Sequence, residues 1–190
     1  ENTVYIHTTL LPYIGASHEV KTKPTQHSVI ELRGMGIQPD IIVTRSPIPL
    51  NENQKSKLSL YCSIPKENVI ESLDVKNIYQ IPINYYEQKM DEIVLKQFDL
   101  PLNKSNLKEW KKLVNITNNL KNEVEISLVG KYVELHDAYI SVTESLKHAG
   151  YKYNTKIIMN WIDSEKLEQS TNLEKIFKNS KGIIVPGGFG

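Results

Sequence analysis

Residues 23–43 read KPTQHSVIELRGMGIQPDIIV, and this stretch decides how the first half of the chain is interpreted. Pro24 is well tolerated in the first turn of a helix, and the apolar Val29 and Leu32 follow at helical spacing before two glycines end the pattern. The run Ile41–Val43 is typical of a buried strand. A helix that leads directly into a buried strand predicts an α/β fold.

The same alternation of strand and helix continues on both sides of this stretch. In the first part of the chain we expect a strand at 3–8, a loop at 9–20 and a short strand at 69–70. Between them we expect a helix at 52–63 that is capped by Asn51 and places Leu58, Tyr61 and Cys62 on one side. In the second part we expect strands at 123–129, 156–162 and 182–185, a turn at Gly130, and helices at 138–149, ending before Gly150, and near 172–179.

The periodic pattern weakens between these two parts, which predicts three segments. Residues 1–100 form the first domain, residues 101–122 form a linker with one amphipathic helix, and residues 123–190 form the second domain. Because the chain opens directly on a strand and stops without a closing helix, we expect both domains to be incomplete in these residues.

Composition excludes several classes of protein. The 23 basic and 22 acidic residues are interspersed and leave a net charge of +1, so no stripe for a nucleic-acid backbone is present. No apolar run approaches the roughly 18 residues that span a bilayer. A chain with a single cysteine fits a reducing compartment, and we expect a cytoplasmic protein. The histidines lack metal-ligand spacing, and no metal site is predicted in this chain.

The segment Lys21–Gln26 carries the densest group of chemically capable side chains. Two lysines, two threonines and a glutamine meet a predicted helix N-terminus, where free N–H groups and the helix dipole favour anions. This combination suits a polyphosphate. An ordinary solvated helix start explains the same residues, and the Gly-x-x-x-x-Gly-Lys-Ser/Thr loop that would decide the matter is absent.

A second candidate is the glycine-rich turn at 186–190, which follows a short apolar strand. Glycines there let backbone N–H groups approach a substrate carbonyl, although such a turn can also be purely structural. No Gly-x-Cys-x-Gly nucleophile turn occurs in the chain. The one cysteine, Cys62, lies on the apolar side of a predicted helix and is expected to be a buried, unreactive thiol.

Seven short segments distributed over nearly the whole chain closely resemble the signature of the CTP synthase family. Nine consecutive residues at 21–29 carry the most specific match. The segments are KTKPTQHSV at 21–29, GIQPD at 36–40, GKYVEL at 130–135, DAY at 137–139, LKH at 146–148, WIDS at 161–164 and VPGGFG at 185–190.

The resemblance implies the later part of a P-loop-type synthetase domain, followed by the start of a class I glutamine amidotransferase domain. It implies an enzyme in which ATP phosphorylates O4 of UTP and ammonia from glutamine then displaces the phosphate. Mg²⁺ would accompany ATP with ligands outside these residues, GTP would activate, CTP would inhibit, and the enzyme would be a tetramer that can form filaments. Residues 1–190 by themselves are expected to be inactive.

The resemblance also implies roles for individual residues. The UTP and CTP site would comprise Lys21, Thr22, Lys23, Pro24, Thr25, Gln26 and Lys57, the ATP site Arg45 and Val75, and the glutamine pocket Gly187, Gly188 and Phe189. Asp137 and Glu144 match positions linked to GTP activation, but Ile140 replaces a basic residue between them. Each assignment has a competing explanation. Lys57 can be a solvated lysine, and Arg45 and Val75 can be plain structural residues. The acidic pair can serve in helix capping.

A rival from another class is a non-catalytic nucleotide-binding or filament-forming module with the same fold. A phosphate loop before residue 1 and a Gly-x-Cys-x-Gly turn after residue 190 would favour the enzyme.

Overall fold

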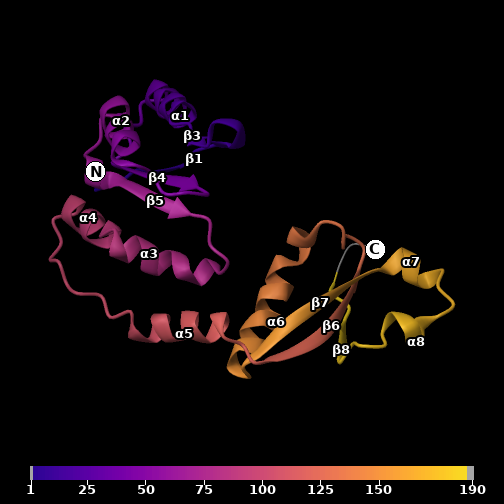
Figure 1. The fold of residues 1–190 in the computed structure, drawn as a ribbon. Helices are drawn as coiled ribbons and strands as arrows, with labels where there is room; N and C mark the ends of the chain where they lie inside the picture. Colours follow the sequence, from indigo (N-terminus) through magenta and orange to yellow (C-terminus); the bar gives the residue numbers. More distant parts are fainter. Residues whose placement is uncertain (1, 188–190) are drawn as a thin grey trace. The chain divides into compact units, whose positions relative to one another are not determined.

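The computed structural model of the protein describes residues 2–187. Its contacts divide the chain into two compact units, Glu1–Lys111 and Lys112–Gly190. Each unit contains a three-stranded parallel sheet with helices between the strands, as the colours of Figure 1 show along the chain. This arrangement confirms the predicted α/β fold. Within the described residues, no helix has the length and apolar character needed to cross a membrane.

The first unit is built on a sheet with strand order β1-β4-β5, and a small antiparallel hairpin, β2-β3, precedes the first helix. Its elements are β1 (Ile6–Leu10), β2 (Tyr13–Ile14), η1 (Gly15–Ser17), β3 (Glu19–Val20), α1 (Lys23–Gly34), β4 (Ile41–Ser46), α2 (Glu52–Cys62), η2 (Lys66–Asn68), β5 (Val69–Leu73), η3 (Ile78–Gln80), α3 (Ile81–Glu87) and α4 (Met90–Gln97). The helix α5 (Lys108–Asn118) spans the boundary between the two units.

Helices cover both faces of this sheet. Successive side chains of β4 point to opposite faces, as in any strand. Ile42 packs in one core cluster with Val29 of α1 and Leu58 of α2. Ile41 and Val43 pack in a second cluster with partly buried residues of α3 and α4. The sheet is therefore the middle layer of three, with α1 and α2 on one side and α3 and α4 on the other (Figure 1).

The second unit is built on a sheet with strand order β7-β6-β8. The chain leaves the central β6, adds β7 on one side through the crossover helix α6, and then adds β8 on the other side of β6. Its elements are β6 (Asn122–Gly130), η4 (His136–Tyr139), α6 (Ile140–Lys152), β7 (Thr155–Asp163), α7 (Ser164–Glu168), α8 (Leu173–Ile176) and β8 (Gly182–Ile184).

Two expectations near the start of the chain were wrong in detail. The first strand begins at Ile6 and continues to Leu10, because that segment pairs in register with β4. The predicted loop at 9–20 contains the end of β1 and the hairpin β2-β3. Of the three residues expected on one side of α2, Leu58 and Cys62 are fully buried, whereas Tyr61 is 58% exposed.

Gly150 does not end its helix, contrary to the prediction. Helix α6 continues through this residue to Lys152. A Cβ at Gly150 would collide with the carbonyl oxygen of Thr155, so the glycine allows α6 to approach β7 closely. Helices α3, α4 and α7 were not expected, and α8 is shorter than the helix predicted near 172–179.

Candidate functional site

The strand ends of the first unit define one edge that can hold a ligand. Because β1, β4 and β5 are parallel, their carboxyl ends lie at the same edge of the sheet. Helices α1 and α2 each follow a strand and therefore begin at this edge. In open α/β sheets, ligands bind at the carboxyl ends of the strands.

The segment Lys21–Gln26 lies at this edge, where α1 begins. The backbone N–H of Lys21 donates to the Pro12 carbonyl at 3.0 Å, which anchors the segment just before the helix. Its ammonium group is half-exposed and lies 2.6 Å from a carboxylate oxygen of Glu19. Thr22 is the N-cap residue, but its side chain accepts no capping hydrogen bond. The first turn of α1 thus presents donors with no acceptor inside the helix.

Thr25 and Gln26 use their side chains within the fold. The Thr25 hydroxyl is buried at 1% exposure and hydrogen-bonds to the Thr9 hydroxyl and, at 3.5 Å, to the Leu10 carbonyl. The Gln26 amide donates to the Thr22 hydroxyl at 3.2 Å. Thr25 therefore fixes the start of α1 onto the end of β1, and what it can offer a ligand is its backbone N–H.

Lys57 reaches the same neighbourhood from α2. The pKa of the Glu19 carboxyl is lowered, mainly by the hydrogen bond from Lys21 and its charge, and the charge of Lys57 adds to this effect. Lys57 is itself exposed in the second turn of α2. Lys21 thus pairs with one exposed carboxylate, and the charge of Lys57 acts on the same carboxylate from α2, so a phosphate that displaces Glu19 would meet positive potential from both lysines.

Arg45 and Val75 lie together at the ends of β4 and β5. The Arg45 guanidinium is 3.2 Å from the carboxylate of Asp74, and the Asp74 backbone N–H donates to the Ser46 carbonyl at 3.1 Å. Val75 follows Asp74 directly. The Arg45 side chain is 69% exposed and planar, so it can stack on a flat ring that approaches this edge.

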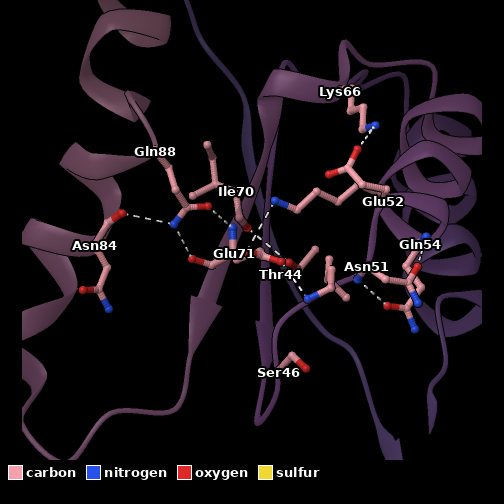
Figure 2. A network of polar contacts seen from close by, with 12 residues as sticks. Thr44, Ser46, Asn51, Glu52, Gln54, Lys66, Ile70, Glu71, Asn84 and Gln88 are labelled. Carbon is pink, nitrogen blue, oxygen red and sulfur yellow. Dashed lines mark hydrogen bonds and ion pairs between the residues drawn. The ribbon is translucent and has the colours of Figure 1, made fainter.

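A polar network around Glu71 of β5 was not predicted from the sequence (Figure 2). Its carboxylate accepts a hydrogen bond from the Leu50 backbone N–H at 2.7 Å and lies 3.4 Å from the Lys55 ammonium. Gln88 contacts the Glu71 backbone on the open side of β5. The only signal in the sequence is a carboxylate inside the short strand Val69–Leu73, and it does not reveal the partners.

The second unit also has a pocket at the carboxyl edge of its sheet. The pocket has a volume of about 370 Å³ and is bordered by the ends of β6, β7 and β8 together with Tyr139. It lies at the carboxyl ends of β6 and β8, between which the strand order reverses, and this is the usual ligand site of such sheets. Its lining residues are Val129, Gly130, Lys131, Tyr132, Tyr139, Ser164, Glu165, Glu168, Val185 and Pro186.

The predicted glutamine turn is described only in part. Gly187 directly follows Pro186 of this pocket and is exposed, and a Cβ added to it would meet no atom of the described residues within 4 Å. Gly188 and Phe189 lie outside the described residues.

Asp137 and Glu144 are seven residues apart on η4 and α6. The Glu144 carboxylate pairs with Lys147 at 2.7 Å, and Asp137 is exposed. Ile140, between them, is 57% exposed. Glu144 therefore has an ion-pair partner on its own helix, and a part in nucleotide activation remains a prediction.

Neither a metal cluster nor a reactive thiol is found in the described part of the chain. Within residues 2–187, no three His, Cys, Asp or Glu side chains gather as potential metal ligands. Cys62 is fully buried, and burial raises the pKa of its thiol, with Arg33 acting weakly in the opposite direction. This confirms the expected burial of Cys62 and argues against a nucleophilic role.

Comparison with known proteins connects both units to one enzyme. The family described as "CTP synthase N-terminus" matches residues 1–100, and the family described as "Glutamine amidotransferase class-I" matches residues 134–190. The first match assigns residues 1–100 to the N-terminal, synthetase part of the family. The sequence had led us to expect the later part of the synthetase, and the match does not support that expectation.

Individual relatives are similar to the chain over its whole length. The CTP synthase of Caldanaerobacter subterraneus subsp. tengcongensis is 50% identical over 190 residues, that of Listeria innocua 52% and that of Phytoplasma australiense 53%. These alignments cover 100% of this chain but 35–36% of each relative, so the chain spans about a third of the length of the curated relatives it matches. The chain belongs to the CTP synthase family.

Proposed function

We propose that this chain is part of an enzyme that makes CTP from UTP, ATP and glutamine-derived ammonia. The observation that carries the proposal is the gathering of Lys21, Lys57 and the first turn of α1 at the carboxyl edge of the first sheet. Three independent sources of positive potential at one edge suit a triphosphate better than a neutral ligand. Membership in the CTP synthase family supports UTP and CTP as the nucleotides.

In the proposed reaction, the uracil N3 loses its proton as O4 attacks the γ-phosphorus of ATP, so an O4–P bond forms, the bond from the γ-phosphorus to ADP breaks, and ADP leaves. Ammonia then attacks C4, phosphate leaves, and the nitrogen loses a proton to give CTP. The residues of this chain hold the reactants. Lys21, Lys23 and Lys57 bind the UTP phosphates, and Arg45 with the backbone near Val75 receives the adenine of ATP.

The proposed synthetase domain is of the P-loop type, and Mg²⁺ would neutralise charge on the ATP phosphates there. We assign Mg²⁺ to no residue of this chain, because its described residues offer no cluster of ligands. We propose that the residues at this edge position the nucleotides.

In the second unit, we propose that the turn at Gly187, Gly188 and Phe189 provides backbone N–H donors for glutamine hydrolysis. The pocket of about 370 Å³ beside Pro186 is large enough for an amino acid. The proposal also includes activation by GTP through Asp137 and Glu144 and feedback inhibition by CTP. It includes a tetrameric or filamentous assembly and a cytoplasmic location.

The test is the ammonia-dependent amination of UTP by the full-length protein that contains this chain. We expect CTP to form with ATP, Mg²⁺ and ammonia, and glutamine to replace ammonia. Tight binding of UTP and CTP without any turnover would instead support the rival, a non-catalytic nucleotide-binding or filament-forming module. Turnover with unchanged UTP affinity in a Lys21→Ala protein would keep the enzyme but reject the proposed phosphate site.

A further inference from the structure

We propose that Glu71 is a positioning residue for UTP, which fixes the start of α2 and thereby the place of Lys57. The inference rests on the proposed function, because it assumes that Lys57 contacts the nucleotide. It adds a residue that does not face the nucleotide edge itself and acts through another side chain.

The Glu71 carboxylate binds two points of the segment that starts α2. One oxygen accepts from the Leu50 backbone N–H at 2.7 Å, one residue before the N-cap Asn51. The other lies 3.4 Å from the ammonium of Lys55 in the first part of the helix. Figure 2 shows Glu71 on its strand between Gln88 on one side and the α2 segment on the other. Lys57 follows Lys55 by two residues, so its position depends on these contacts.

Both members of this ion pair are largely shielded from water. The side chain of Glu71 is 16% exposed and that of Lys55 is 24% exposed. A shielded carboxylate with two good partners holds its position more firmly than an exposed one, and removing it leaves a shielded cation without compensation. The contact is thus able to fix a helix, which an exposed surface pair is not.

Glu71 is in turn held from the opposite side. Within the described residues β5 is an edge strand, and its backbone at Glu71 is covered by one amide side chain. Gln88 accepts from the Glu71 N–H at 2.7 Å and donates to the Glu71 carbonyl at 2.8 Å. The Gln88 amide therefore takes the place of a neighbouring strand at this residue, and the carboxylate extends from a fixed backbone.

A second connection runs from α2 to the segment before Lys21. Gln54 completes a capping box with Asn51, and its amide nitrogen also donates to the Val20 carbonyl at 3.3 Å. The first turn of α2 is thus attached to β3 by Gln54 and to β5 by Glu71. Lys57 and Lys21 are held at one edge through these two attachments.

The same helix provides a matched control. Glu52, in the first turn of α2, forms an ion pair with Lys66, as Figure 2 also shows. The Glu52 side chain is 81% exposed, so this pair lacks the shielding of the Glu71 pair. Glu52→Gln removes an exposed charge from the first turn of α2 and should leave Lys57 in place.

The experiment measures KM for UTP, KM for ATP and kcat in the full-length enzyme with ammonia as the nitrogen donor. In Glu71→Gln, an acceptor for the Leu50 N–H is kept while the charge opposite Lys55 is lost, and we expect KM for UTP to rise about threefold to tenfold. Glu71→Ala should raise it further. KM for ATP should stay within twofold of the wild type, and Glu52→Gln should behave as the wild type.

A double-mutant cycle with Lys57→Ala distinguishes positioning from general stability. If Glu71 acts through Lys57, Glu71→Gln should add less than twofold to the KM for UTP once Lys57 is absent. Fully additive effects, or equal rises in KM for UTP and ATP, would overturn the inference and leave the proposed function intact. A normal KM for UTP in Lys57→Ala would overturn the inference and remove Lys57 from the UTP site, while the turnover itself would keep the proposed enzyme. Should Glu71→Ala fail to fold, the cycle with Glu71→Gln decides.

Discussion

The carboxyl edges of the two sheets differ in the chemical groups around them. At the edge of the β1-β4-β5 sheet, charged side chains from several elements converge, and each is held by named contacts such as Lys21 with Glu19 and Arg45 with Asp74. At the edge of the β7-β6-β8 sheet, a pocket ends at Pro186, which the sequence continues with Gly187 and Gly188. We propose that the first edge binds its ligand through charged side chains and the second through backbone N–H groups.

This difference determines how each edge can be disrupted. A site made of side chains loses affinity when a side chain is truncated, in proportion to the contacts removed. A site made of backbone N–H groups keeps its donors after most substitutions and is disabled when atoms are added in the space of the ligand. Truncation of a side chain should therefore be informative at the first edge, and addition of a side chain should be informative at the second.

The largest effect is expected at the glycine edge. Gly188→Val should add a side chain where the glutamine amide has to lie, and glutamine-dependent CTP formation should fall on the order of 10²–10³-fold. The ammonia-dependent rate of the same full-length variant is the internal control and should stay within a factor of about two. Parallel loss of both rates would mean that the turn supports the fold as a whole.

A smaller effect is expected from truncation at the charged edge. Lys21→Ala should weaken the binding of UTP and of CTP together, by roughly 10- to 150-fold, because one charge-assisted contact to phosphate is lost. Titration calorimetry on the full-length protein measures both affinities. Lys66→Ala, which removes another paired lysine of the same unit, should bind both nucleotides normally. Unchanged affinities in Lys21→Ala would remove this segment from the site.

The smallest effect is expected at Glu19, the carboxylate that we propose competes with the nucleotide for Lys21. Glu19→Gln should bind UTP about twofold to fivefold more tightly at neutral pH, because Lys21 no longer has an alternative partner. The hydrogen bond from Lys21 lowers the pKa of Glu19, so its charge persists above this lowered pKa and is lost as the pH falls through it. The difference between wild type and Glu19→Gln should therefore vanish at acid pH. A difference that grows on acidification would assign the effect to another group.

The fold was predictable where one residue pattern dominated. Pro24 and the apolar spacing after it placed α1, and the capping residue Asn51 placed α2, which the structure confirms with a full capping box. The start of β1 was misplaced because strand limits depend on the register with β4 rather than on local composition. Gly150 was read as a helix end, but its role is close packing against β7, which a single sequence does not reveal.

Only part of the proposed site could be singled out from the sequence, and its binding role stays a prediction. Lys21–Gln26 could be singled out because a dense polar cluster preceded a helix, and the family resemblance added Lys57, Arg45 and Val75. Glu71 was missed because its partner Lys55 lies sixteen residues earlier, on a helix that packs beside the strand. Asp74 was missed in the same way, although it immediately precedes Val75. Contacts across elements depend on the fold, and local spacing does not contain them.

We propose above all that Lys57 and the start of α1 together hold the phosphates of UTP. The most direct test is to measure the affinities of UTP and of uridine for the full-length protein, in the wild type and in Lys57→Ala. We predict that Lys57→Ala lowers the affinity for UTP at least about tenfold and leaves the affinity for uridine unchanged, because only the triphosphate contacts the lysine. Equal losses for both ligands, or an unchanged affinity for UTP, would contradict the account.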